Sequence, residues 1–264
     1  RNGFSGYFSD LLRFRHLCWN LVGADLRARF RRSRLGIIWA ILQPLSFSLL
    51  ISMVWGTLFQ QNLLEFAVYV FSGMIVWEYF VNTVFQAQDT FVSSEGYLKQ
   101  GRIPLIIFQA RAPLSGCIIW LAGLVGLIGL LAALGKMPPL GMHLLNVVLF
   151  IPVIVLFLMP IAIIFSFLGT KLRDLRHAVT IFINALFFLS PVMLAREYLE
   201  KDEVAFLQYA NPIIPLLDLF RAPLLEGTYW KLLDVQIMSV WIVALWAIAI
   251  YMSKRFGRSI VFSI

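Results

Sequence analysis

Residues 27–34 hold five arginines, and an uncharged apolar stretch follows them directly. That stretch, residues 35–59, contains no charged side chain over 25 positions. A helix needs about 20 apolar residues to cross the hydrocarbon core of a bilayer, which is roughly 30 Å thick. Basic residues beside such a stretch are typical of its cytosolic end. The junction therefore predicts a membrane span, and it places the preceding segment in the cytosol.

The composition indicates that this span is one of several. Hydrophobic residues make up 60% of the chain and charged residues 14%, against about 45–50% and about 25% in soluble domains. We therefore expect an all-α, multi-pass membrane protein. A net charge of +8 would also suit a nucleic-acid-binding protein, but the basic residues gather at the ends of apolar stretches, as in membrane proteins. Nucleic acid is not an expected partner.

Six stretches are long and apolar enough to be predicted as transmembrane helices. Of the 22 Lys and Arg residues, 17 fall on the side that carries both termini and 5 on the other, so we expect both termini in the cytosol. No cleavable signal peptide is visible, and the first span is expected to direct insertion. The prediction divides the chain into a cytosolic segment, 1–34, and a transmembrane domain, 35–264, with spans at 35–59, 66–85, 112–134, 144–168, 177–194 and 235–251.

The amino-terminal segment has a helical amphipathic pattern. Its apolar residues recur at helical spacing, while a second set of positions is polar and basic. This pattern predicts a helix that lies in the membrane interface. It serves either as an anchor for the first span or as a docking surface for a partner. The apolar stripe consists of Phe8, Leu11, Leu12, Cys18, Trp19, Val22, Leu26 and Phe30.

A second apolar run, residues 211–227, lies in the loop between the fifth and sixth spans. It is too short to cross a bilayer and contains Pro212, Pro215 and Pro223. Such a run is either a surface helix on the outer leaflet or a re-entrant element, which must be covered by protein. We favour the re-entrant form, because prolines interrupt a continuous helix.

The spans are almost free of ionisable residues. Glu78 lies inside the second span and Arg111 at the start of the third, both near the cytosolic ends of their helices. We expect them to form a structural ion pair and not a proton relay. Carriers driven by protons or sodium ions need such groups near mid-membrane, so ion-coupled transport is disfavoured. Glycines 123, 126 and 129 have a spacing that suits close helix packing.

No constellation of residues predicts catalysis, a metal site or a bound cofactor. Cys18 and Cys117 lack metal-ligand spacing. The segment 129–136 has five residues between its glycines, where a phosphate-binding loop has four, and it lacks the following Ser or Thr. We therefore expect a transport subunit and not an enzyme, with no ATP site of its own. The loops 86–104 and 169–179 are predicted to be either contacts for a soluble partner or simple connections between spans.

Three segments together resemble a known family. They are RARFRRSRLGIIWAILQPL at 27–45, the charged loop at 171–176, and NPIIPLLDLFR at 211–221. In this order they resemble the membrane subunits of type-2 ABC exporters, most of all the permeases for O-antigen, capsule and teichoic-acid polysaccharides. The first segment is the most specific of the three.

The resemblance implies a homodimer bound to two copies of a separate ATPase that holds ATP and Mg. Its substrate would be a lipid-linked polysaccharide crossing the bacterial inner membrane. The implied residues for ATPase coupling are Arg13, Arg27, Arg31, Ser94, Glu95, Tyr97, Lys171, Arg173 and Asp174. Those for entry of the lipid diphosphate are Arg29, Arg32, Arg34, Leu35 and Gly36. The implied channel aromatics are Trp39, Phe47, Trp55, Phe182 and Phe187, and the implied periplasmic gate holds Asn211, Pro212, Pro215, Asp218 and Arg221.

Two alternatives remain open at this point. The first is an ABC permease that exports drugs or small lipids, which predicts a narrow pocket with polar anchors instead of a continuous aromatic channel. The second is a membrane scaffold or enzyme of envelope biogenesis, which would work without an ATPase.

Overall fold

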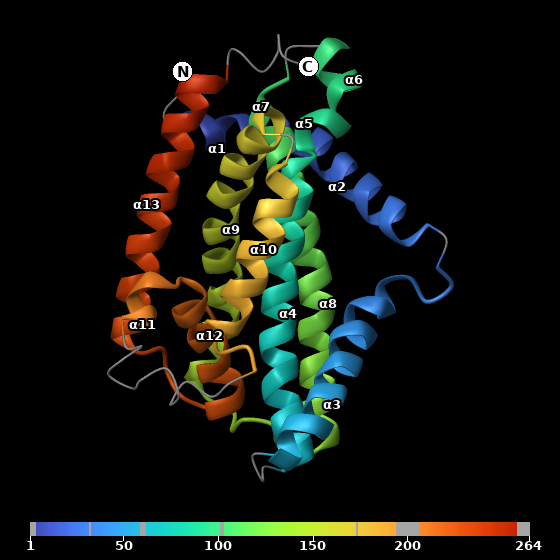
Figure 1. The fold of residues 1–264 in the computed structure, drawn as a ribbon, viewed down its shortest axis with the longest axis vertical. Helices are drawn as coiled ribbons and strands as arrows, with labels where there is room; N and C mark the ends of the chain where they lie inside the picture. Colours follow the sequence, from blue (N-terminus) through green and yellow to red (C-terminus); the bar gives the residue numbers. More distant parts are fainter. Residues whose placement is uncertain are drawn as a thin grey trace.

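The computed structural model describes residues 4–31, 33–58, 62–100, 103–172, 174–193 and 206–257, and all regular structure in these ranges is helical (Figure 1). This confirms the all-α prediction. The elements are α1 (Phe4–Arg13), α2 (Arg15–Phe30), η1 (Gly36–Ile38), α3 (Trp39–Leu58), α4 (Leu63–Gln88), α5 (Thr90–Ser93), α6 (Glu95–Gln100), α7 (Leu105–Gln109), α8 (Arg111–Ala133), η2 (Met142–Leu144), α9 (Leu145–Lys171), α10 (Leu175–Phe188), α11 (Leu207–Ala210), α12 (Ile213–Arg221), η4 (Ala222–Glu226) and α13 (Leu232–Phe256).

Five helical stretches in the described residues are long and apolar enough to cross a membrane. They correspond to the first four predicted spans and the last one. The fifth predicted span, 177–194, is represented by α10, which has 14 residues and falls short of the usual length for crossing alone. The six-span count is therefore not confirmed. The five stretches are Gly36–Gly56, Leu63–Gln88, Leu105–Ala133, Met142–Lys171 and Leu232–Phe256.

The long helices run along one axis of the molecule, with the short helices grouped at the ends (Figure 1). The beginning of α1, the end of α13 and the short helices α5, α6 and α7 lie together at the top of the view, which we call the terminal end. The α8–α9 connection lies at the bottom, with α11 and α12 in the lower part; we call this the far end.

Helix α4 forms the centre of the bundle and contacts α3, α8 and α9. Two glycines of α8 allow this helix to approach α4 and α3 closely. A Cβ atom on Gly123 would lie 3.0 Å from Ile75 of α4, and one on Gly126 would lie 2.6 Å from Ile41 of α3. Gly129 has no neighbour within 4 Å of this position, so the packing role predicted for the three glycines holds for the first two only.

The amino-terminal segment is two helices and not one. Helix α1 ends at Arg13 and α2 begins at Arg15, with Phe14 between them. The predicted apolar stripe is not buried as one face: Cys18 and Val22 of α2 are buried, whereas Leu12 of α1 and Trp19 of α2 are more than half exposed. The break at Phe14 was not predicted from the sequence periodicity.

The apolar run between the predicted fifth and sixth spans is buried in protein. Helix α12 contacts α13, α9 and α4, and eight of its nine residues are buried. This disfavours a surface helix. The prolines do not interrupt the run, because Pro215 lies in the first turn of α12 and Pro223 lies in the π-helical turn η4, which continues α12 directly. The missing amide of Pro215 costs nothing in a first turn.

Candidate functional site

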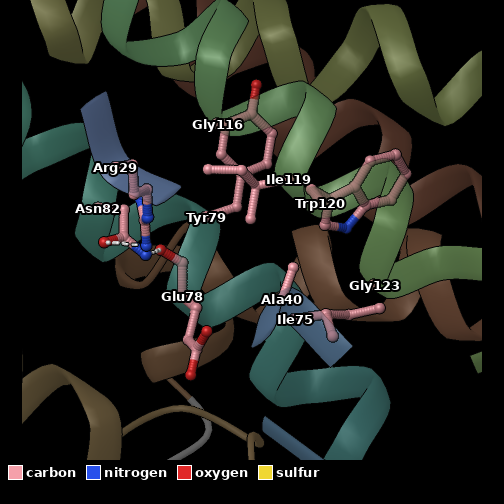
Figure 2. Close-up of a pocket in the computed structure, with 10 residues that line it drawn as sticks. All are labelled: Arg29, Ala40, Ile75, Glu78, Tyr79, Asn82, Gly116, Ile119, Trp120 and Gly123. Carbon is pink, nitrogen blue, oxygen red and sulfur yellow. Dashed lines mark hydrogen bonds between the residues drawn. The ribbon is translucent and has the colours of Figure 1, made fainter. Parts of the chain in front are cut away.

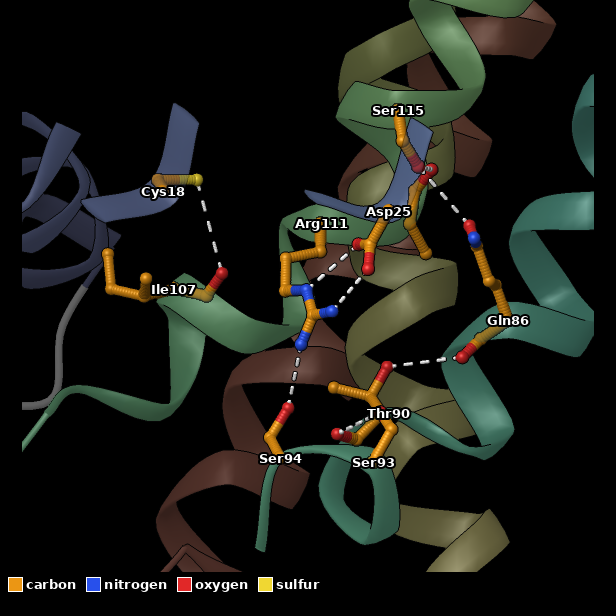
Figure 3. Close-up of polar contacts among 10 residues, drawn as sticks. Cys18, Asp25, Gln86, Thr90, Ser93, Ser94, Ile107, Arg111 and Ser115 are labelled. Carbon is orange, nitrogen blue, oxygen red and sulfur yellow. Dashed lines mark hydrogen bonds and ion pairs between the residues drawn. The ribbon is translucent and has the colours of Figure 1, made fainter. Parts of the chain in front are cut away.

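Arg111 joins three elements at the terminal end (Figure 3). This residue opens α8. Its Nε donates to Oδ2 of Asp25 on α2 at 2.9 Å, and its Nη2 donates to Oδ1 of the same carboxylate. Its Nη1 donates to Oγ of Ser94, between α5 and α6, at 2.9 Å. We call Asp25, Ser94 and Arg111 the junction; it fixes α2 and the α5–α6 segment to the start of α8.

The predicted ion pair between Glu78 and Arg111 is wrong, because Arg111 is paired with Asp25. Asp25 was not predicted as a partner of Arg111. A signal was present, since Asp25 is the only acidic residue between Asp10 and Glu65 and precedes the arginine-rich segment. A lone carboxylate in a basic amphipathic segment is a candidate partner for a cation on a neighbouring helix. Of the predicted coupling residues, Ser94 is thus the one bonded in the junction.

A second ion pair lies beside the junction and involves α10. Arg176, in the first turn of α10, donates from Nη1 to Oδ2 of Asp89 at 3.0 Å, and its guanidinium lies 5.5 Å from the centre of the Phe85 ring. Asp89 immediately precedes α5. The segment 89–94 therefore contacts α10 at its beginning and α8 at its end.

A cavity of about 200 Å³ lies next to these contacts. Most of its lining residues are polar or charged, and they come from α2, from the end of α4 with α5, and from the α7–α8 region. Cys18 lies nearby, and its thiol donates to the carbonyl oxygen of Ile107 at 4.0 Å (Figure 3). Burial raises the pKa of Cys18, and the charge of Arg111 partly opposes this rise. The cavity is lined by Asp25, Gln86, Asp89, Thr90, Ser93, Phe108, Arg111 and Ala112.

The other predicted coupling residues are not part of the junction. Glu95 pairs with Lys99 one helical turn along α6. The ring of Tyr97 packs 6.2 Å from that of Phe108 and is 46% exposed. The ammonium of Lys171 lies 3.0 Å from the centre of the Phe256 ring. Arg13, Arg27, Arg31 and Asp174 are exposed, and Arg173 lies outside the described residues.

Arg29 and Glu78 lie together in a small pocket between α2, α3, α4 and α8 (Figure 2). Arg29 donates to Oδ1 of Asn82 at 3.3 Å, and Asn82 donates to the carbonyl oxygen of Glu78 at 2.7 Å. The enclosed space is about 20 Å³, enough for one water molecule. The buried indole nitrogen of Trp120, which lines the pocket, has no hydrogen-bond partner among the described residues.

The Leu35–Gly36 turn connects α2 to the first candidate span. Oγ of Ser33 accepts hydrogen bonds from the amides of Leu35 and Gly36, both at 3.2 Å, and from the indole of Trp39 at 3.0 Å. Gly36 has a φ of +53°, in the left-handed region that favours glycine. Of the predicted lipid-entry residues, Arg29 lies in the pocket described above, Arg34 is exposed at this turn, and Arg32 lies outside the described residues.

The five predicted channel aromatics lie on α3 and α10. Trp39, Phe47 and Trp55 are between 40% and 46% exposed, and Phe182 is 62% exposed. Phe187 is less exposed, and its ring packs 5.2 Å from that of Trp77 on α4. Exposed aromatic rings suit either lipid or a channel, so their role stays a prediction.

Two of the predicted gate residues, Asn211 and Arg221, form several buried hydrogen bonds at the far end. Asn211 and Arg221 are each 3% exposed. Asn211 donates to the carbonyl oxygen of Leu189 and to Oγ of Ser190. Arg221 donates to Ser72 and Tyr69 of α4 and to the carbonyl oxygens of Pro191 and Val192. Pro212 directly precedes α12, Pro215 lies in its first turn, and Asp218 is half-buried on it.

Comparison with known proteins identifies related chains. Residues 16–225 match the family model described as ABC-2 type transporter. The chain is 27% identical over 218 residues to the O-antigen export system permease protein RfbA of Myxococcus xanthus, covering 81% of this chain and 82% of that protein. It is 22% identical to a Klebsiella pneumoniae protein of the same name, covering 95% and 94%. It is also 22% identical to the polysialic acid transport protein KpsM of Escherichia coli, covering 77% and 79%.

Proposed function

This chain belongs to the ABC-2 type transporter family, and from that premise we propose that it is the permease subunit of an ABC exporter for a lipid-linked polysaccharide. The observation that carries the proposal is the agreement of its relatives. The RfbA and KpsM proteins are named as a permease or transport protein for O-antigen or polysialic acid, and they align with 77% to 95% of this chain. This agreement favours a polysaccharide over a drug or small lipid, and a transporter over a scaffold or enzyme.

We propose that ATP is hydrolysed by a separate ATPase subunit, which also holds the Mg²⁺, and that two copies of this chain bind two copies of that subunit. The terminal end supports this arrangement. Its exposed arginines and its short helices α5 and α6 offer a polar surface, and the junction connects α2, α5, α6 and α8 beneath it. A partner that moves α5 would thereby act on two long helices.

In this proposal the terminal end faces the cytosol of a bacterium and the far end faces the periplasm. Seventeen of the 22 Lys and Arg residues lie in segments assigned to the cytosol, as the positive-inside rule requires. Arg29, Arg34 and the Leu35–Gly36 turn would meet the lipid diphosphate, because guanidinium groups bind phosphate oxygens in a bidentate manner. Asn211–Gly227 would form the re-entrant periplasmic gate.

The test is co-expression with an ATPase encoded beside this gene. We expect the two proteins to co-purify, and ATP hydrolysis in proteoliposomes to fall when the chain is cut before Leu35. Masses measured by light scattering should fit two copies of each subunit. A chain that purifies alone, and under which no candidate ATPase changes its activity, would rule out the exporter proposal.

A further inference from the structure

Helix α10 differs from the five long apolar helices in how it is held. Its middle is exposed: Ile181 and Phe182 are 72% and 62% exposed, while Val179 and Ile183 are buried. It therefore packs along a narrow strip. Each end of α10, in contrast, is fixed by polar contacts to other elements. The contacts at the far end are buried, whereas the ion pair at the terminal end is exposed.

At the far end, Asn211 connects the turn that follows α10 to the beginning of α12. Its Nδ2 donates to the carbonyl oxygen of Leu189 at 3.0 Å and to Oγ of Ser190 at 2.8 Å. Its Oδ1 accepts from the amide of Ile213, the first residue of α12, at 3.0 Å. Because Asn211 is buried, no water competes for these bonds. Hydrogen bonds in such surroundings are stronger than in water.

Arg221, at the end of α12, connects the same turn to α4. Its guanidinium donates to the carbonyl oxygens of Pro191 and of Val192, the latter at 3.1 Å. It also donates to Oγ of Ser72 at 3.0 Å and to the carbonyl oxygen of Tyr69 at 3.1 Å, and it lies 3.7 Å from the centre of the Tyr69 ring. We call Asn211 and Arg221 the far anchor.

Gly73 leaves the space that the guanidinium fills. A Cβ atom at position 73 would lie 2.5 Å from Nη2 of Arg221 and 2.8 Å from the carbonyl oxygen of Val192. The glycine on α4, the arginine on α12 and the turn after α10 therefore fit together as one packed unit. Moving the far end of α10 alone would leave a buried charge and several buried carbonyl groups without partners, which is costly.

At the terminal end, α10 is held by an exposed ion pair, which is a weak contact. Arg176 and Asp89 form an ion pair whose side chains are 60% and 62% exposed. Exposed ion pairs contribute little to stability, because water competes with them and two long side chains must be ordered. The same pair connects α10 to the start of α5. It can therefore open and close at little cost while the far anchor stays intact.

We infer that α10 pivots about its far end: Asn211 and Arg221 are positioning residues that hold this end against α4, while the terminal end of α10 moves relative to α5 when the Asp89–Arg176 pair opens. The inference rests on the proposed exporter function for the cause of the movement. It makes the far anchor a fixed point and the terminal end the part that responds to an ATPase.

The first experiment measures two distances by pulsed electron paramagnetic resonance in a background without Cys18 and Cys117. One spin-label pair, Val92→Cys with His177→Cys, reports the terminal end. The other, Leu64→Cys with Leu189→Cys, reports the far end. All four sites are exposed. In the complex with its ATPase, trapping the ATP-bound state should change the distance between the terminal-end labels by more than about 2 Å, which exceeds the small shifts that most binding events cause. The distance between the far-end labels should stay unchanged.

The second experiment needs no ATPase, so it separates the pivot from the exporter proposal. In the chain alone, in nanodiscs, Arg221→Leu should broaden the far distance distribution and not the terminal one, and Arg176→Leu should do the opposite. Arg221→Lys keeps the charge but loses the planar fork, and should give an intermediate breadth. If Arg221→Leu does not fold, Gly73→Ala displaces the guanidinium while keeping it in the chain.

Three outcomes would overturn the pivot. They are a far distance that shifts as much as the terminal one, two distances that both stay fixed while export proceeds, and equal broadening of both pairs by Arg221→Leu. If no ATPase binds, the exporter proposal is overturned instead. The measurements on the chain alone would still show whether Asn211 and Arg221 hold the far end of α10.

Discussion

At the scale of single residues, Arg111 has a different partner from the one that its sequence neighbourhood predicted. Glu78 was predicted to lie at the same depth in the membrane as Arg111, whereas Asp25 was assigned to a separate cytosolic segment. Only the packing of α2 against α8 brings Asp25 to Arg111. Spacing within a helix is readable from a sequence, whereas contacts between distant segments depend on how two helices cross.

The junction predicts the effect of a charge exchange. Arg111→Ala should destabilise the chain by about 1–3 kcal/mol, because Asp25 is partly buried and would lose its donors. Exchanging the charges, Asp25→Arg with Arg111→Asp, should recover part of this loss, since paired residues are not additive. Thermal unfolding in detergent measures both effects. No recovery in the double variant would show that Asp25 and Arg111 do not stabilise each other.

Gly36 predicts a purely conformational effect. A Cβ atom there would meet nothing within 4 Å, yet its φ is +53°. Gly36→Ala should therefore cost about 1–2 kcal/mol through the backbone alone. Gly36→Asn should cost less, because asparagine tolerates this region. Equal unfolding temperatures for wild type and Gly36→Ala would contradict the observed turn geometry.

At the scale of helices, the five long apolar stretches and their approximate limits were predictable from hydropathy alone. The break at Phe14 and the length of α10 were not. Both depend on tertiary contacts: α2 turns its Cys18 and Val22 face to the bundle, and the far anchor binds the chain just after α10. Likewise, the prolines of the 211–227 run did not interrupt it, because their positions within the helical turns, and not their presence, decide the effect.

Two glycines on different helices provide a matched pair for testing helix packing. A Cβ atom on Gly169 of α9 would lie 2.3 Å from the carbonyl oxygen of Gln88, whereas Gly129 of α8 has open space. Gly169→Ala should therefore force α9 from the end of α4 and cost about 1–3 kcal/mol. Gly129→Ala should be neutral or stabilise its helix by up to about 1 kcal/mol. Unfolding temperatures that fall equally for both variants would show that α9 and α4 do not approach so closely.

At the scale of the whole molecule, the sequence predicted the family and the kind of protein, and the comparisons agree with both. The site was predicted in part. Ser94, Asn211 and Arg221 make buried contacts, whereas the aromatic residues of α3 and α10 remain candidates for the channel. Their neighbours depend on lipid and on other chains, which the sequence of one chain does not encode directly.

The proposed orientation predicts an asymmetric pattern of chemical labelling. Single cysteines at Leu140, which is 95% exposed at the far end, and at Tyr97, which is 46% exposed at the terminal end, should differ in intact cells. A maleimide that cannot cross the inner membrane should label Leu140→Cys, and should label Tyr97→Cys only after lysis. The reverse pattern would place the terminal end outside the cytosol.

The shortness of α10 has a consequence for hydration. In the proposed exporter, where α10 serves as the fifth span, its 14 residues rise about 21 Å, so about 9 Å of a hydrocarbon layer roughly 30 Å thick remains beyond its end. Backbone that is not helical must cover this distance, and hydrocarbon offers its carbonyl groups no donor. Arg221 and Asn211 supply donors to Leu189, Pro191 and Val192. These buried amide and guanidinium groups thus take the place of water as hydrogen-bond donors to this stretch of backbone.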